Sequence, residues 1–233
     1  MNFILEGIKK GLVLIFTCNT EVLSIVKLSL FVSLFATCVS VFIGVPLGSI
    51  IALKKFPLKK IVISLINTGM GLPPVVVGLF VMLFLSRRGP LGFLEWLYTP
   101  KGMILSQIII ATPIVIGLSS AAMQSIDPKF YLQILALGAN ERQALLICLK
   151  EIRLSILAAV IAGFGSIISE VGAVMIVGGN IKNQTRVLTT TMVLETQMGN
   201  FDIAIALGLI LLTLSFMINL ALTFIQQQKV QHK

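Results

Sequence analysis

The sequence predicts an all-helical integral membrane protein with about five transmembrane helices. Of 233 residues, 57% are hydrophobic and only 12% are charged, whereas a soluble domain carries roughly 25% charged residues. The mean hydropathy is +1.03, and the apolar residues gather in long stretches of about the length that crosses a bilayer. Backbone amides in lipid have no water to bond, so these stretches must be helical.

The predicted elements follow in chain order within one transmembrane domain, residues 1–233. Residues 1–16 hold Glu6, Lys9 and Lys10 inside an apolar pattern, which favours an interfacial amphipathic helix over a cleaved signal peptide. The five predicted spans are residues 28–53, 61–86, 102–126, 154–181 and 203–228.

The distribution of basic residues predicts the orientation. Residues 54–60 contain four lysines, and so short a basic loop is expected on the cytoplasmic side. With five spans, residues 124–153 and the C-terminus are then cytoplasmic and the N-terminus is outside. Arg87, Arg88, Lys101, Lys182 and Arg186 fall on the outer side and oppose this orientation. The formal net charge of +9 fits lipid head groups better than nucleic acid.

Prolines interrupt three of the predicted spans, at Pro46, at Pro73 with Pro74, and at Pro113. Each removes a backbone donor and clashes with the preceding turn, so the helices should kink or break there. Gly71-Leu-Pro-Pro lies near the middle of its span. Broken helices at that depth are typical of transport pathways, although membrane helices also tolerate Gly and Pro in ordinary packing.

Glu170 is the lone acidic residue inside a predicted span. An intramembrane carboxylate is a functional candidate by default, for example as the proton site of a secondary carrier. The alternative is a hydrogen-bonded support, with Ser166 one turn away on the same helix face as a local partner. In a pathway for anions a bare negative charge would repel the cargo, and for such a pathway we favour the structural role.

The segment 124–153 is patterned as a short helix, a glycine turn and a second helix. Asp127 and Pro128 suit a helix start, Gly138 suits a left-handed turn, and Asn140 precedes the second helix. The Leu137-Gly138-Ala139 turn between two helices resembles the coupling motif of ABC importer permeases. The flanks differ from that family's usual Glu-Ala-Ala and Leu-Pro, with Leu-Gln-Ile at residues 132–134 and Lys150-Glu151 after the turn.

Three further stretches resemble the molybdate and tungstate permeases of bacteria and archaea, and the tungstate branch is the closer match. They are GLPPVVVGL from Gly71, ISEVGAVMIVGGNI from Ile168 and TRVLTTTMVLE from Thr185. The resemblance implies a type I ABC importer permease in the cell membrane of a bacterium or archaeon. Its cargo would be a tetrahedral oxyanion, either tungstate or, as the alternative, molybdate or sulfate.

The same resemblance implies partners and site residues. This subunit would form a homodimer in the lipid bilayer, with two ATPase subunits that bind the ATP and Mg and an external oxyanion-binding protein. The expected ATPase-coupling residues are Leu135, Leu137, Gly138, Ala139 and Glu141. The candidates for the translocation pathway are Gly71, Pro73, Pro74, Glu170, Gly172, Thr189 and Thr190.

No catalytic residue, metal site or bound cofactor is predicted in this chain. The sequence lacks the G-x-x-x-x-G-K-[ST] phosphate loop, H-E-x-x-H and G-x-S-x-G. Its single histidine is His232, and its three cysteines have no metal-ligand spacing. The remaining alternative is a proton-coupled carrier that uses Glu170. The helix-glycine-helix segment argues against it, since such a carrier has no use for a docking surface of that kind.

Overall fold

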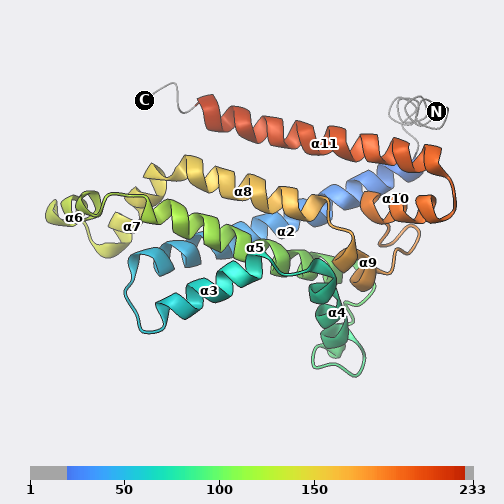
Figure 1. Ribbon diagram of the computed structural model, residues 1–233, viewed down its shortest axis with the longest axis horizontal. Helices are drawn as coiled ribbons and strands as arrows, with labels where there is room; N and C mark the ends of the chain where they lie inside the picture. The colour runs from blue at the N-terminus through green and yellow to red at the C-terminus, as the bar shows by residue number, and fades with distance from the viewer. Residues whose placement is uncertain (1–19, 229–233) are drawn as a thin grey trace.

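The computed structural model describes residues 20–228, so the predicted amphipathic helix at residues 1–16 lies outside the described residues. The described part is helical and contains no strand (Figure 1). Its helices are α2 (Thr20–Leu53), α3 (Lys59–Met70), α4 (Pro74–Leu85), the 3-10 turn η1 (Gly92–Leu94), α5 (Pro100–Gln124), α6 (Pro128–Ala136), α7 (Glu141–Glu151), α8 (Arg153–Ile168), α9 (Gly172–Gly178), α10 (Leu188–Gln197) and α11 (Phe201–Gln228).

Three of the described helices, α2, α5 and α11, are each long and apolar enough to cross a bilayer. Two bent pairs meet the same criterion when taken together: α3 with α4, bent by 99°, and α8 with α9, bent by 58°. The chain therefore has three to five candidate spans, and the five regions coincide with the five predicted ones. Of the three proline sites only Pro73 and Pro74 end a helix, because α2 continues through Pro46 and α5 through Pro113.

Helices α2 and α5 pack along a seam of small residues on α2, which we call the small-residue seam. Its buried members are Ser29, Ser33, Ala36, Thr37, Ser40, Gly44 and Gly48. A Cβ atom added to Gly48 would lie 2.6 Å from the carbonyl oxygen of Ile116, so the two backbones nearly touch there. Between membrane helices, where lipid removes the hydrophobic drive, such close approach supplies van der Waals packing. Across this seam Ser40 donates to the Ile108 carbonyl at 3.5 Å and accepts the Thr112 hydroxyl at 3.2 Å.

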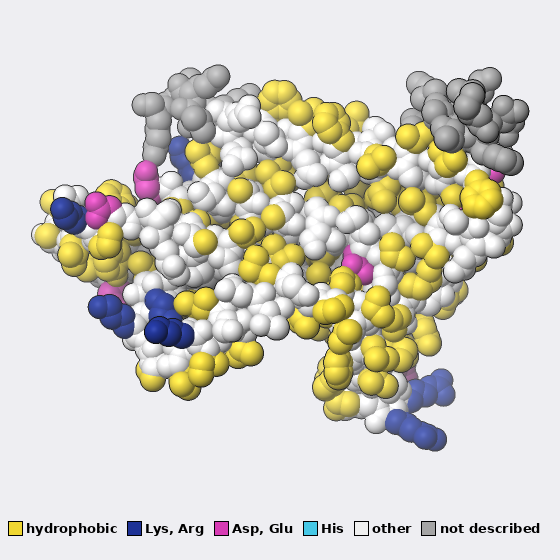
Figure 2. All heavy atoms as spheres, in the orientation of Figure 1, with side chains coloured by type: hydrophobic (Ala, Val, Ile, Leu, Met, Phe, Trp, Pro, Cys, Tyr) yellow, Lys and Arg dark blue, Asp and Glu magenta, His cyan; other side chains and the backbone are white. Residues whose placement is uncertain are grey.

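The outer surface of the bundle suits lipid. Phe31, Phe35 and Phe42 on α2 are 55%, 50% and 82% exposed. In Figure 2 the middle of the visible face is mainly hydrophobic, and charged side chains gather beside α6 and α7 and beside the tip of α4. This arrangement agrees with the integral membrane class predicted from composition.

The bundle has two distinct ends (Figure 1). The hairpin end holds α6 and α7, and the end of α2 lies against it, because Ala52 and Leu53 pack on the core around Met123, Ile134 and Cys148. The loop end holds α9, α10 and the start of α2. The main core lies between the ends and toward the loop end, where α2, α4, α5, α8 and α9 meet.

Candidate functional site

The helix-glycine-helix prediction for residues 124–153 is confirmed. Helix α6 begins after Asp127, whose side chain accepts the Lys129 N–H at 2.8 Å. The chain turns at Gly138, which has φ +91°. Helix α7 then begins with a capping box, in which Asn140 and Gln143 each bond the other's backbone N–H at 2.9 Å. We call residues 127–151 the coupling hairpin, after the role that the family resemblance predicts for them.

The coupling hairpin has a small core of its own. Ile134, Ala144 and Cys148 are buried there against Met123 of α5. Burial raises the pKa of the Cys148 thiol, which keeps it protonated and unreactive. Cys148 therefore packs as a small apolar side chain.

The five predicted ATPase-coupling residues fall into two groups. Leu137 is 88% exposed, and Gly138 and Glu141 are also exposed. Leu135 and Ala139 are partly buried and pack on the hairpin core. The sequence interpretation missed Leu132, which is 62% exposed on α6. Its signal was an apolar residue on the face of α6 opposite the core. Exposed leucines on a polar hairpin are typical of docking surfaces.

The first broken pair is α3 with α4, and the break predicted at Gly71, Pro73 and Pro74 is confirmed. Helix α3 ends at Met70, Pro73 is extended, and α4 begins with Pro74 at its first position. Gly71 and Leu72 donate their N–H groups to Thr68 and Gly69, at 3.1 and 3.4 Å. The two prolines have no N–H to satisfy, and the Val76 and Val77 N–H groups donate to the Pro73 carbonyl at 3.0 and 3.3 Å.

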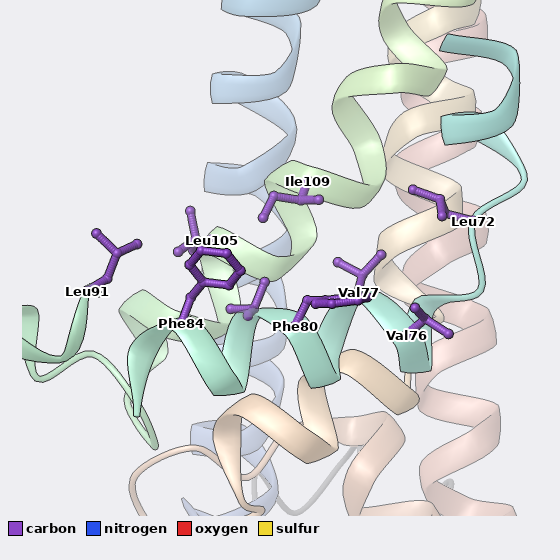
Figure 3. Close-up of a pocket in the computed structure, with 9 residues that line it drawn as sticks. Leu72, Val76, Val77, Phe80, Phe84, Leu91, Leu105 and Ile109 are labelled. Atoms are coloured by element: carbon purple, nitrogen blue, oxygen red, sulfur yellow. The ribbon is translucent and has the colours of Figure 1, made fainter. Parts of the chain in front are cut away.

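Because α4 turns away from the bundle, an apolar hollow of about 390 Å³ opens between α4 and α5 (Figure 3). Its lining residues are Leu72, Val76, Val77, Phe80, Val81, Phe84, Leu91, Leu105 and Ile109. In Figure 3 the labelled side chains of α4 and α5 lie around the same space. The lining offers no charged group and no side-chain hydrogen-bond donor, so the hollow suits an apolar partner and not an oxyanion.

The second broken pair, α8 with α9, corrects two predictions. Residues 154–181 were expected to form one continuous span, but α8 ends at Ile168 and α9 begins at Gly172. Glu170 therefore lies in the break and not inside a helix. One-turn pairing with Ser166 fails for the same reason. The Glu170 carboxylate instead accepts the Ala173 N–H at 3.1 Å, and its backbone carbonyl accepts the Thr189 hydroxyl at 2.9 Å.

A small polar cavity lies beside this break. It is lined by Ser29, Ser33, Gln107, Glu170 and Thr189, together with Val32, Ile168 and Val187. The space is about 10 Å³, roughly enough for the centre of one water molecule. Gln107 is 3% exposed and donates its Nε2 to the Ile167 carbonyl at 3.1 Å. Its Oε1 has no hydrogen-bond partner among the described residues. The only sequence signal for Gln107 was a polar residue inside an apolar span.

The two broken pairs touch each other where α4 crosses α9. A Cβ atom added to Gly78 of α4 would lie 2.6 Å from the Ala173 Cα, and one added to Gly172 would lie 2.5 Å from the Val75 side chain. Gly172 thus has a visible packing role. The absence of side chains at both glycines brings the halves of the two broken spans together.

Thr189 and Thr190 are placed in the core of the subunit. Thr190 is fully buried, and its hydroxyl bonds both the N–H and the carbonyl of Val187, at 3.2 and 3.1 Å. Thr189 reaches the polar cavity through its bond to Glu170. The roles of these residues in translocation stay predictions.

The exposed part of the α9–α10 loop is its tip. There Lys182 pairs with Glu21 at 2.8 Å. Arg186 is partly exposed, and its Nε has no hydrogen-bond partner within residues 20–228. The loop as a whole fits an anion-contacting surface, a docking surface for a partner, or an ordinary solvated loop.

Comparison with known sequences gives consistent matches over most of the chain. The family described as "Binding-protein-dependent transport system inner membrane component" matches residues 44–231. The tungstate uptake system permease protein of Peptoclostridium acidaminophilum is 39% identical over 98% of this chain and 100% of that protein. A probable anion ABC transporter permease protein of Haloferax volcanii is 43% identical over 86% of this chain and 88% of that protein.

Comparison with solved structures supports the fold. A crystal structure of a bacterial ABC transporter involved in the import of alginate, an acidic polysaccharide, matches with a TM-score of 0.77. It has 21% identity over 94% of this chain and 83% of that chain. A second crystal structure, of a bacterial alginate ABC transporter with an alginate-bound periplasmic protein, has a TM-score of 0.75 and 21% identity, covering 90% of this chain and 80% of that chain. At this identity the likeness shows the fold alone, which is that of an ABC importer permease.

Proposed function

Because the chain belongs to the family of binding-protein-dependent transport system inner membrane components, we propose that it is the permease subunit of an ATP-driven oxyanion importer. The observation that carries this proposal is the coupling hairpin. An exposed helix-glycine-helix at one end of a lipid-embedded bundle gives a membrane protein a surface through which a soluble motor can act on it.

The cargo we propose is tungstate. A tungstate permease aligns with this chain over its whole length, and the sequence motifs also match that branch most closely. Molybdate and sulfate are the alternative cargoes, since all three are tetrahedral dianions of similar shape. The Arg186 side chain is partly exposed at the loop end, and Arg is well suited to oxyanion contacts.

We place the ATPase at Leu137, Gly138 and Glu141, with Leu132 added to the contact. Leu135 and Ala139 support this surface from beneath, because they pack on the hairpin core. ATP and Mg would be bound by the two ATPase subunits, and this chain would bind no cofactor. The basic loop at residues 54–60 lies at the same end as the hairpin. This supports a cytoplasmic hairpin end, a cytoplasmic C-terminus and an N-terminus outside.

A single copy offers only one wall of a pathway, which supports a homodimer. Gly71 and Pro73 are exposed at the first break, and the apolar hollow between α4 and α5 is uncovered in one copy. On α4, Val75, Phe80 and Leu83 are 55%, 56% and 50% exposed. A second copy over this face would cover the hollow and enclose the broken helices between two subunits. An external binding protein would deliver the oxyanion at the loop end.

Two substitutions at Gly138 test the coupling role. Gly138 has φ +91°, and an added Cβ atom would meet nothing within 4 Å. The penalty for a side chain there therefore comes from the backbone alone. Asn tolerates left-handed conformations, whereas a β-branched residue does not. Gly138→Val should leave the protein in the membrane but abolish cargo-stimulated ATP hydrolysis by the reconstituted complex, and Gly138→Asn should retain it within a few-fold. Normal stimulation in the Val variant would contradict the assignment.

The proton-coupled carrier remains the second candidate, because Glu170 is an acid at membrane depth. The contacts of Glu170 favour a support, since its carboxylate accepts a backbone N–H at the start of α9. Uptake that collapses with an uncoupler at constant ATP would favour the carrier. Uptake that requires the ATPase and survives the uncoupler would favour the importer.

A further inference from the structure

The basic loop between α2 and α3, residues 54–60, has a defined structure held by hydrogen bonds. The Lys59 ammonium donates to the carbonyls of Ala52 and Lys54, at 2.8 and 3.1 Å. It thereby satisfies carbonyls that the end of α2 leaves unpaired. Leu58 takes a left-handed conformation, φ +66°, which turns the chain directly into α3. Lys59 thus has a structural role, and the exposed lysines Lys55 and Lys60 do not share it.

Beside this turn lies an open hollow of about 640 Å³, which we call the lysine hollow. It is lined by Lys55, Phe56, Leu58, Lys59, Lys60, Ile61 and Ile63. Lys55 and Lys60 are exposed and make no ion pair with another described residue. Cationic groups and large apolar side chains therefore border the same space.

An apolar stripe continues from the lysine hollow along α3. Leu58, Ile61 and Leu65 are 69%, 54% and 65% exposed. Their spacing of three and then four residues puts Ile61 and Leu65 on one face of α3, directly below the turn. No side chain of α3 is fully buried in the bundle. The stripe is thus an uncovered apolar surface that begins beside the exposed ammonium groups of Lys55 and Lys60.

We propose that the lysine hollow binds one anionic phospholipid. Its phosphate lies between Lys55 and Lys60, and one acyl chain follows Leu58, Ile61 and Leu65 along α3. Because the two lysines lie beside an apolar stripe, the site favours a ligand with an anionic head and an apolar chain. A free phosphate would meet the lysines but leave the stripe uncovered. An acidic protein surface would meet the lysines and bring no apolar chain. The hollow sits at the end of two helices that enter the bilayer, at the depth where head groups lie.

Lipid binding to the full-length protein tests this proposal. Native mass spectrometry of the detergent-purified chain, titrated with phosphatidylglycerol or phosphatidylcholine, measures retention of individual lipids. The test variant is Lys55→Gln with Lys60→Gln, which leaves the structural Lys59 intact. The matched control is Arg87→Gln with Arg88→Gln, which removes two exposed cations just beyond α4.

At about 1 kcal/mol for each basic residue near an anionic surface, the test variant should bind phosphatidylglycerol on the order of 10- to 30-fold more weakly. The control variant should change phosphatidylglycerol binding less than about twofold, because Arg87 and Arg88 do not line the lysine hollow, and phosphatidylcholine binding should change equally little.

The apolar part of the proposal has its own readout. Leu65→Ser should weaken long-chain phosphatidylglycerol several-fold and leave a short-chain, water-soluble phosphatidylglycerol unaffected. Three outcomes would overturn the proposal. The first is equal loss in both double variants, which would show a nonspecific charge effect. The second is no effect of Leu65→Ser at either chain length, which would indicate a site for the phosphate alone. The third is unchanged lipid binding with loss of ATPase association, which would make the lysines a protein contact.

Discussion

The two broken spans bend by 99° and 58°, and their breaks have different origins in the sequence. The break between α3 and α4 carries a glycine and two prolines, and Gly71, Leu72 and Pro73 there are exposed. The break between α8 and α9 carries no proline. It is fastened to neighbouring elements through the Glu170 carboxylate, the Thr189 hydroxyl and the close approach of α4. The first break follows from its own glycine and prolines, whereas the second depends on tertiary contacts.

The difference has a physical basis. Proline in a helix interior costs about 3 kcal/mol or more, so the adjacent Pro73 and Pro74 favour a break through local chemistry, although α2 and α5 each continue through a single proline. Residues 169–171, Ser-Glu-Val, carry no comparable penalty and would continue α8 if left alone. They leave the helix because Glu170 caps the first turn of α9 and because Gly172 and Ala173 lie directly against α4. Three predictions test this contrast, from the largest expected effect to the smallest.

The largest effect is expected where the two broken pairs touch. In Gly78→Ala the new Cβ atom would lie 2.6 Å from the Ala173 Cα, so either α4 or α9 must move. Overpacking of this kind costs about 1–3 kcal/mol and should lower the thermal unfolding temperature of the purified protein. Gly165→Ala is the matched control, because its Cβ would meet nothing within 4 Å. Equal stability of the two variants would show that the second break does not depend on this contact.

A smaller effect is expected at Glu170. Glu170→Leu removes the acceptor for the Ala173 N–H and should cost about 1–2 kcal/mol, as the loss of a helix cap does. Glu170→Gln keeps a side-chain oxygen for that bond while removing the titratable proton. Cargo uptake by the Gln variant should therefore stay within a few-fold of the parent, and uptake by the Leu variant should fall further. If the Gln variant is inactive while stable and assembled, Glu170 acts through its proton and the support role is wrong.

The smallest change in stability is expected at the prolines. Pro74 occupies the first position of α4, where a missing N–H costs nothing. Pro74→Ala should therefore change the free energy of unfolding by less than about 1 kcal/mol. The double variant Pro73→Ala, Pro74→Ala should instead broaden the distance distribution between spin labels at Ser64 on α3 and Leu83 on α4. A distribution that stays narrow and unchanged would mean that tertiary contacts hold both breaks, and the contrast would fail.

These cases also show what the sequence was able to predict. The spans, the proline break and the coupling hairpin follow from signals carried by a few neighbouring residues. Asp127, Gly138 and Asn140 act within their own turns, so their roles are visible without knowing what surrounds them. The family resemblance rested on the same kind of short motif, and it agreed with the comparisons over nearly the whole chain.

The remaining features depend on residues distant in sequence, so no local pattern reveals them. The Gln107 oxygen has no partner among the described residues, and it borders a cavity lined by side chains of α2, α8 and α10. The sequence named Thr190 as a candidate for the translocation pathway but did not show that the fold buries it and bonds its hydroxyl to the Val187 backbone. The Glu170 break arises because α4 returns to touch α9. No proline or glycine cluster marks it in the sequence.

The small-residue seam between α2 and α5 constrains how this protein can diverge over evolutionary time. A lipid-facing position such as Phe42, 82% exposed, accepts almost any apolar side chain, so mutations there accumulate nearly neutrally. Gly48 has no such freedom, because even one methyl group would reach the Ile116 carbonyl. A substitution at Gly48 requires a compensating change on the facing helix α5. If the Gly48 substitution occurs first, the intermediate protein is poorly packed. Related sequences should therefore differ most at the lipid-facing positions of α2 and least at the positions of the small-residue seam.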